Sequence, residues 1–126
     1  MSCLDDTHRV DMLSLGEQAA RAIRDLNHLT RGPDAFADPA ETCQLIAALA
    51  TMIGRLPQLL DQISTWLHGE RVAGLLRVDA TAGTDDPAEL DTLITECLTQ
   101  AGHCAHRLNH VLDTAQQHAA HLAAAP

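Results

Sequence analysis

Apolar residues recur along two stretches of the chain at alternating spacings of four and three residues. This spacing keeps one face of an α-helix against its neighbours through successive turns. The first stripe consists of Leu45, Leu49, Met52, Leu56, Leu59, Ile63 and Trp66, and the second of Leu90, Ile94, Cys97, Ala101, Cys104, Leu108, Val111, Ala115, His118 and Leu122. The pattern therefore predicts long helices that lie side by side and bury these two stripes.

The sequence Asp-Pro-Ala-Glu occurs twice, at residues 38–41 and 86–89, and has the composition of a helix start. The Asp can accept hydrogen bonds from free backbone N–H groups, Pro suits the first helical position, and Glu meets the positive end of the helix dipole. The repeat marks either a duplicated hairpin or two independent uses of a good cap. The residues that follow the two copies match poorly, which favours independent use.

We predict three helices, at about residues 11–31, 39–76 and 87–123. The first begins at Asp11 or already at Asp6, and Gly32-Pro33 ends it. The second reaches at least Leu67, and its continuation to Leu76 is left open by the glycines on the way. Residues 79–86 form the clearest loop between helices.

Pro57 lies inside the second predicted helix, where it removes one backbone hydrogen bond and crowds the carbonyl of Ile53. We therefore expect a bend at this residue. At 100° per residue, Pro57 points away from the stripe that contains Leu56 and Leu59, so the helix is expected to curve around the core with Pro57 outside. The bend is either a hinge or a static feature, and a static bend is the commoner case.

A second apolar row runs beside each stripe and widens the apolar face of both helices. The rows are Ile46, Ile53, Leu60 and Leu67 in the second helix, and Leu98, Ala105, Leu112 and Ala119 in the third. Broad faces allow each helix to touch two neighbours. The predicted fold is all-α, an antiparallel bundle of three long helices, the second bent at Pro57, that forms one domain over residues 1–126. Dimerisation into a larger bundle is the alternative use of the excess apolar surface.

Composition supports an all-α protein and narrows its partners. The chain has 126 residues, one Phe, one Trp and no Tyr, so few of the residues that favour strands are present. The net charge of −9 repels phosphate backbones and anionic lipids, so neither nucleic acid nor a membrane is expected as a partner. No secretory signal or apolar run of about 20 residues is apparent, so we expect a cytoplasmic protein whose cysteines are thiols.

Three histidines of the third helix, His103, His106 and His110, share one face because they are spaced by three and four residues. Such spacing can seat Zn²⁺ or a similar ion. The face lies opposite the stripe of Cys97 and Cys104, however, and is expected to be exposed, without further side chains to orient the ligands. An exposed polar face that gains charge near pH 6 is the simpler interpretation.

The remaining candidate residues point to packing rather than chemistry. Cys97 and Cys104 lie on the predicted buried stripe and are interpreted as small buried hydrophobes, while Cys43 is placed to approach the third helix. Trp66 closes its stripe, as a plug at one end of the bundle or as an anchor for a partner protein. No catalytic arrangement, phosphate loop or Glu-x-x-His motif is found, so neither an enzyme nor a cofactor is predicted.

Three segments of the chain carry a resemblance to known proteins: Ala22-Ile23-Arg24-Asp25-Leu26-Asn27-His28-Leu29-Thr30, then Asp38-Pro39-Ala40-Glu41, then Arg55-Leu56-Pro57-Gln58-Leu59-Leu60 followed by Trp66-Leu67. Together they resemble small, uncharacterised helical proteins of actinomycetes such as streptomycetes, over about residues 20–80. The resemblance implies a bacterial cytoplasmic accessory protein, and no activity or ligand.

The function predicted from these observations is non-enzymatic. We expect a protein–protein interaction or assembly module, with self-association as a homodimer through the broad helix faces as one form of it. The alternative is a metal-binding or pH-sensing bundle that uses His103, His106 and His110.

Overall fold

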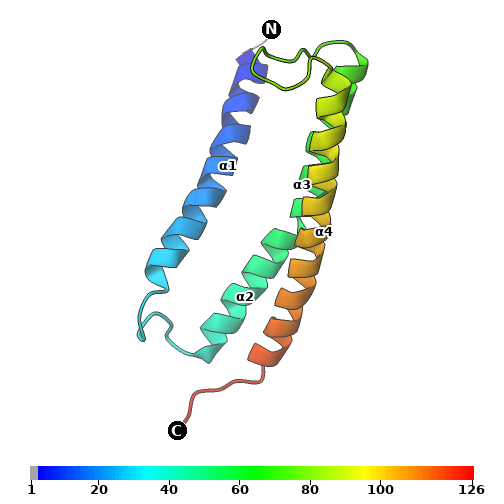
Figure 1. Cartoon of the computed structure of the whole chain (residues 1–126). Coiled ribbons are helices and arrows are strands. Elements are labelled where there is room, and N and C mark those ends of the chain that lie inside the picture. The colour runs from blue at the N-terminus through cyan, green and yellow to red at the C-terminus, as the bar shows by residue number, and fades with distance from the viewer. Residues whose placement is uncertain (1–2) are drawn as a thin grey trace. The chain divides into compact units, whose positions relative to one another are not determined.

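The computed structural model describes residues 3–126, with side chains from residue 11 onward, and contains helices and no strands over this range. The elements are α1 (Cys3–Leu29), α2 (Pro39–Gly54), α3 (Leu56–Val72) and α4 (Pro87–Ala119) (Figure 1). Joined, α2 and α3 form one helix with a bend of 22° that packs against α4. The all-α class, the three helices and the bent second helix are thus confirmed. The chain divides into two compact units, residues 1–37 and 38–126, which are described separately.

The first unit consists of α1 and the turn that follows it. The helix begins at Cys3, well before Asp11, and ends at Leu29, two residues before the predicted end. Thr30 closes the last turn, because its backbone N–H and its hydroxyl both donate to the carbonyl of Leu26, at 2.9 and 2.7 Å. Gly32 then adopts a left-handed conformation with φ of 85°, as expected of a glycine that ends a helix.

The joined helix of the second unit starts where the first Asp-Pro-Ala-Glu segment predicts. Asp38 is the N-cap, and its carboxylate accepts a hydrogen bond from the backbone N–H of Glu41 at 3.1 Å. The helix ends at Val72, so the continuation to Leu76 is wrong. Gly74 takes a left-handed conformation with φ of 74°, and the N–H of Leu75 donates back to the carbonyl of Glu70.

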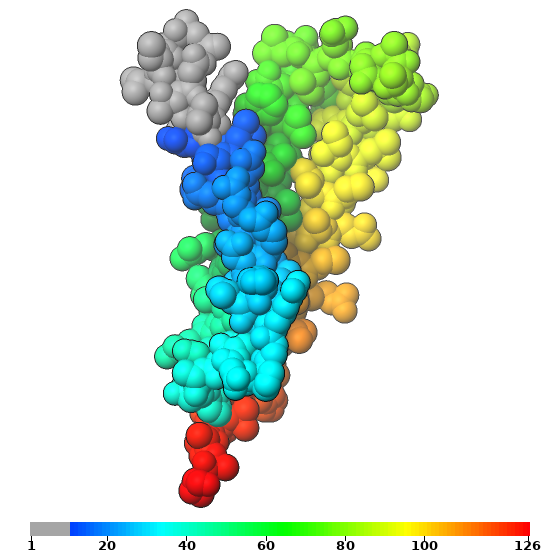
Figure 2. All heavy atoms as spheres, turned by 90° about the vertical axis from the view of Figure 1, so that its left-hand side faces the viewer, coloured from blue at the N-terminus to red at the C-terminus, as the bar shows by residue number. Residues whose placement is uncertain are grey.

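α4 begins at the second Asp-Pro-Ala-Glu segment and is capped in a similar way. Asp86 accepts from the backbone N–H of Ala88 at 3.0 Å, while the hydroxyl of Thr84 accepts from the N–H of Asp86 and donates to Glu89 at 2.7 Å. The helix ends at Ala119, four residues before its predicted end. The loop of residues 73–86 lies where α3 ends and α4 begins, and the last residues extend beyond the end of α4 (Figure 2).

α4 runs antiparallel to α2 and α3, and the three helices form a hairpin (Figure 1). The contact between its two arms is called the seam, and it follows the same four-three spacing as the predicted stripes. Its residues, all buried or half-buried, are Cys43, Ile46, Ala50, Ile53, Pro57, Leu60, Ser64, Leu67 and Arg71 from α2 and α3, and Asp91, Thr95, Leu98, Gly102, Ala105, Asn109, Leu112, Gln116 and Ala119 from α4. The seam thus mixes apolar, small and polar residues.

Pro57 belongs to the seam, so the prediction that it lies on the outer face is wrong. It is half-buried, and a Cβ placed on Gly102 of α4 would lie 3.9 Å from its Cα. The bend itself has the predicted cause. Proline has no N–H to donate to the carbonyl of Ile53. Just before the proline, the N–H of Arg55 donates to the carbonyl of Met52, only three residues back, which tightens the helix there. Both α2 and α3 nevertheless contact α4, one on each side of the bend.

Candidate interaction face

The two stripes predicted as buried faces are not the residues that join the hairpin. Each stripe residue directly precedes a seam residue, as Leu59 precedes Leu60 and Cys97 precedes Leu98. One residue is a rotation of 100° about a helix axis. Because the arms are antiparallel, the same rotation on both places the two stripes on one side of the hairpin. The apolar face is defined here as Leu45, Leu49, Met52, Leu56, Leu59, Ile63 and Trp66 with Leu90, Ile94, Cys97, Ala101, Cys104, Leu108, Val111 and Ala115.

Many large side chains along the apolar face are exposed, and its other large side chains are half-buried. Leu59 is 51% exposed and Ile63 42% on α3, while Leu108 is 46% and Val111 62% exposed on α4. Single exposed apolar residues are normal on a protein surface, but a contiguous face of this length is typical of an interaction site. The apolar face therefore has the properties of an interaction surface that the seam of the hairpin does not bury.

The three cysteines whose side chains are described divide between the seam and the apolar face. Cys43 is in the seam, as predicted, and its thiol donates to the backbone carbonyl of Gln116 at 3.7 Å. Cys97 and Cys104 are exposed, so their interpretation as buried hydrophobes is wrong for the hairpin. All three carry free thiols. Cys97 and Cys104 are therefore natural reporters of whether the apolar face is covered.

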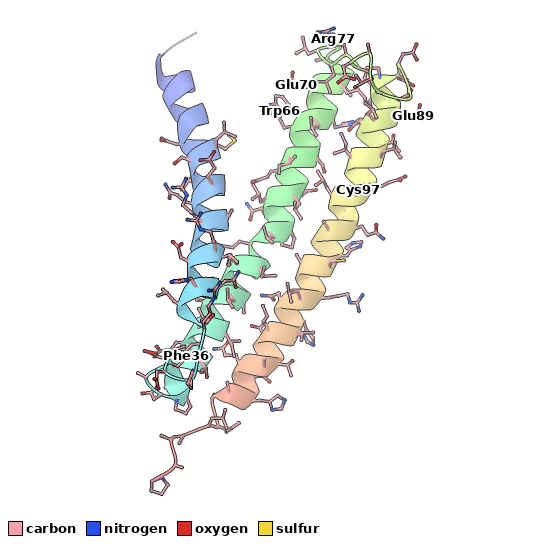
Figure 3. The ribbon with its side chains drawn as sticks, turned by 60° about the vertical axis from the view of Figure 1, so that its left-hand side comes forward. Phe36, Trp66, Glu70, Arg77, Glu89 and Cys97 are labelled. Atoms are coloured by element: carbon pink, nitrogen blue, oxygen red, sulfur yellow. The ribbon has the colours of Figure 1, made fainter. Side chains whose placement is uncertain are left out.

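Trp66 lies at the α3 end of the apolar face. Its residue is 61% exposed and projects from α3 away from α4, so it does not pack in the seam (Figure 3). A large, rigid and exposed indole next to Leu59 and Ile63 is the kind of side chain that anchors protein interfaces. Its role as a partner anchor stays a prediction.

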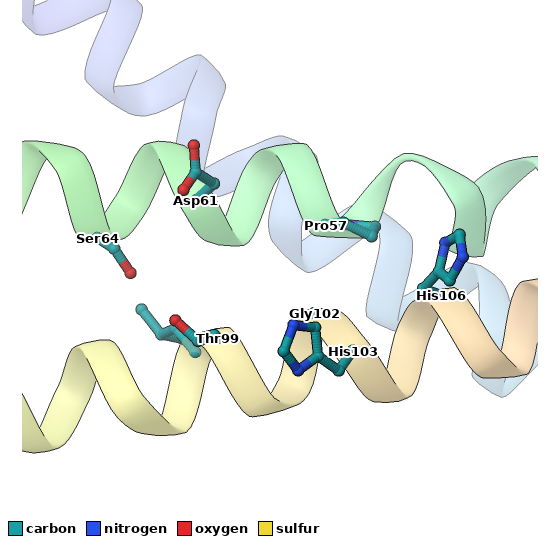
Figure 4. Close-up of a pocket in the computed structure, with 8 residues that line it drawn as sticks. Pro57, Asp61, Ser64, Thr99, Gly102, His103 and His106 are labelled. Atoms are coloured by element: carbon teal, nitrogen blue, oxygen red, sulfur yellow. The ribbon is translucent and has the colours of Figure 1, made fainter.

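The predicted histidine face is exposed at all three residues, His103, His106 and His110. His103 and His106 border a groove of about 340 Å³ on the side of the hairpin opposite the apolar face, with Asp61 across from them on α3 (Figure 4). Among residues whose side chains are described, no three His, Cys, Asp or Glu side chains are grouped closely enough to hold a metal ion. The metal or pH-sensing site stays a prediction, testable by Zn²⁺ titration of His106→Ala against the unchanged protein.

A buried carboxylate joins the end of α3 to the start of α4. Asp91 is 7% exposed, and one of its oxygens accepts from Arg71 Nε at 2.6 Å and lies 3.1 Å from His68 Nδ1. Thr95 donates to the other oxygen at 3.4 Å. The hydrogen bond from Arg71, and next the one from His68, lowers the pKa of Asp91 below its ordinary value of 3.8. This ionised cluster fixes the register of the two arms near the loop.

An amide in the seam performs the same task near the bend. Asn109 Nδ2 donates to the backbone carbonyl of Ala50 at 2.6 Å. Gly54 makes room for this side chain, since a Cβ at residue 54 would lie only 2.9 Å from the same nitrogen. A single buried amide is a known way to specify register between helices. Asn109 and Asp91 thus fix the register of the two arms at two positions along the hairpin.

Sequence reasoning did not identify Asp91, Asn109 or their partners. The available signal was a second four-three series in α4, offset by one residue from the apolar stripe and interrupted by polar side chains. Only its apolar members, such as Leu98 and Leu112, entered the predicted flank. The more hydrophobic series was assigned to the interior, although the mixed one forms the seam.

Comparison of the chain with protein-family models, curated proteins and solved structures finds no significant match. The resemblance to helical proteins of actinomycetes stays a prediction.

Proposed function

We propose that the chain is a non-enzymatic protein–protein interaction or assembly module whose docking surface is the apolar face of the hairpin. The observation that carries the proposal is that the seam leaves out the apolar stripes of both arms, many of whose large side chains are exposed. Burying apolar surface is the main driving force of most protein association. Trp66, Leu59 and Ile63 supply the large side chains around which such interfaces concentrate their binding energy.

The same apolar composition also meets a criterion for membrane helices. By length and composition alone, the joined helix Pro39–Val72 could cross a membrane, although a core helix of a bundle passes the same test. Arg55 and Asp61 lie in its central turns, and charged side chains are costly at the centre of a bilayer. Helix-on-helix docking explains the uncovered stripe without placing these charges in lipid.

The proposal is tested by the reactivity of Cys97 and Cys104 toward a maleimide, read by peptide mass spectrometry in intact producing cells and in purified full-length protein. If a protein covers the face, both thiols are labelled slowly in the unchanged chain. Ile63→Glu puts a charge on the face and is expected to accelerate labelling at least several-fold. Thr65→Glu, the matched control, adds the same charge on the exposed side of α3 away from the face.

Two results would overturn the proposed docking surface. One is rapid labelling of both thiols in the unchanged protein in cells as well as in solution. The other is protection that Ile63→Glu and Thr65→Glu relieve equally, because the added charge would then act through stability and not through the face.

A further inference from the structure

We infer that the occupant of the apolar face is the same face of a second copy of this chain, with the two α4 helices antiparallel about a two-fold axis at Ala101. This inference rests on the proposed function and adds the partner and its arrangement. In such a dimer the two α2–α3 helices also face each other, about Leu56. The product is a four-helix arrangement of two hairpins, a common way for helical hairpins to bury a second face.

The exposed area is close to what a stable homodimer needs. The large side chains of the face leave on the order of 600 Å² of apolar surface open on each copy, and standard interfaces bury about 800 Å² per partner. The half-buried members of the stripes and their polar borders supply the remainder. A copy of the chain offers an apolar partner surface of the same length.

One axis can serve both arms because their midpoints lie at the same level. Gly102 and Pro57, the neighbours of Ala101 and Leu56, meet across the seam at 3.9 Å when a Cβ is placed on the glycine. On the α4 stripe, the residues nearest Ala101 are small and those seven positions away are large. Cys97 and Cys104 therefore allow the two α4 helices to approach closely, while Ile94 of one copy lies level with Leu108 of the other.

Charge on the outer border of α4 is complementary under the same axis. Glu96 and Arg107 are exposed on the edge of the apolar face that is remote from α2 and α3, and neither forms an ion pair within the described residues. Residues that lie equally far before and after Ala101 come to the same level in the two copies. Arg107 of one copy therefore lies within one residue of the level of Glu96 in the partner, which is about 1.5 Å along the helix axis. Each dimer thus gains two such pairs.

The same axis brings two exposed Arg55 side chains near each other on the α2–α3 border. These are two long side chains at an interface rim, where they can turn apart into solvent. The inferred axis thus forms two attractive Glu96–Arg107 pairs against one Arg55–Arg55 approach.

The first test uses the cysteines of the full chain as distance reporters, after Cys3→Ser and Cys43→Ser remove the other two. In the inferred register, Cys97 of one copy lies about 1.5 Å along the helix axis from the level of Cys104 in the partner. Along the same direction, the two Cys97 residues are offset by about 12 Å and the two Cys104 residues by about 9 Å, which is too far for a disulfide. Copper-phenanthroline oxidation should therefore link the two chains through Cys97 and Cys104. Adding either Cys97→Ser or Cys104→Ser should abolish the link.

The second test measures association itself by sedimentation equilibrium. The unchanged chain is expected at twice its 13.5 kDa mass. Glu96→Arg or Arg107→Glu alone should raise the dimer Kd about tenfold, and the two together should restore it to within about threefold, because the pair is then reversed. Recovery of the dimer Kd in the double variant would show that the two residues contact each other across the two-fold axis. A general loss of fold would not be reversed in this way, and circular dichroism monitors it separately.

The outcomes distinguish this inference from the proposed function. A monomer at about 100 µM with protected Cys97 and Cys104 would overturn the second copy and keep the docking surface, since another segment or partner then covers the face. A dimer that links Cys97 to Cys97, or ignores the charge exchange, would overturn the antiparallel arrangement. Flotation of the chain with phosphatidylcholine vesicles, abolished by Ile63→Glu, would overturn both in favour of a membrane.

Discussion

Exchanging Gly54 for alanine tests how the seam positions the bend of the long helix. Gly54 has an ordinary helical backbone, so an alanine fits its φ and ψ angles. In an open helix this change stabilises a protein by about 0.5–1 kcal/mol, since alanine loses less conformational freedom on folding. At Gly54, however, the added Cβ would lie 2.9 Å from Asn109 Nδ2, which is too close for a non-bonded contact.

If the amide of Asn109 retreats from the added Cβ, it lengthens or breaks its 2.6 Å hydrogen bond to the carbonyl of Ala50. Loss of that hydrogen bond lowers the free energy of unfolding by about 0.5–1.5 kcal/mol, and by more where the amide is left unpaired. The gain from alanine and the loss of the Asn109 hydrogen bond nearly cancel, or the loss is larger. We therefore expect Gly54→Ala to leave the stability unchanged or to lower it. In an Asn109→Ala background the obstacle is gone, and the same substitution should stabilise by about 0.5–1 kcal/mol.

The assay is urea unfolding followed by circular dichroism at a fixed protein concentration, arranged as a double-mutant cycle with an expected coupling of about 1 kcal/mol. Gly102→Ala is the control, because its Cβ would meet Pro57 at an ordinary 3.9 Å and should stabilise the chain by about 0.5–1 kcal/mol. The reasoning is refuted if Gly54→Ala stabilises the unchanged chain as much as it stabilises the Asn109→Ala protein.

Three further predictions follow from the seam and the caps. In dilute protein, Leu112→Ala should lower the free energy of unfolding by about 2 kcal/mol and Leu108→Ala by less than about 1 kcal/mol. The reason is that Leu112 packs in the seam whereas Leu108 lies on the apolar face. Equal losses in urea titrations would contradict this assignment. Asp38→Ala should cost about 1 kcal/mol by the same assay, since the N–H of Glu41 loses its acceptor, and Asp38→Asn should retain most of the stability. Asp91→Asn should destabilise the hairpin at neutral pH; because the folded-state pKa of Asp91 is lowered, its contribution is complete above the unfolded value of 3.8 and is lost as the pH falls through the lower folded value. The difference between the unfolding midpoints of the two proteins should therefore be present at neutral pH and shrink as the pH falls below about 4, and a difference that persists undiminished at pH 2 would show that the charge is not the cause.

Local signals in the sequence were sufficient for much of the fold. Asp38 and Asp86 start their helices as predicted because a capping carboxylate and a following proline act on residues within the same turn. Gly32 ends α1, and Pro57 bends the long helix, because both act on their own backbone. Helix ends were less accurate, as at Val72, where Gly74 already takes a left-handed conformation, and at Ala119, which has no glycine or proline beside it to mark the end.

The amino-acid sequence by itself determined that the chain is helical, where the two long helices of the hairpin begin, where one of them bends, and that four-three series of side chains run along them. It could not determine which of two adjacent series joins the helices, because they differ by one residue and either one describes a continuous helix face. Only the tertiary structure decided this, by burying the series that contains Asp91 and Asn109, whose ion pair and hydrogen bond have partners on the opposite arm. That choice rotates each helix by about 100°, turns Pro57 toward α4 and leaves the more hydrophobic series outside the seam.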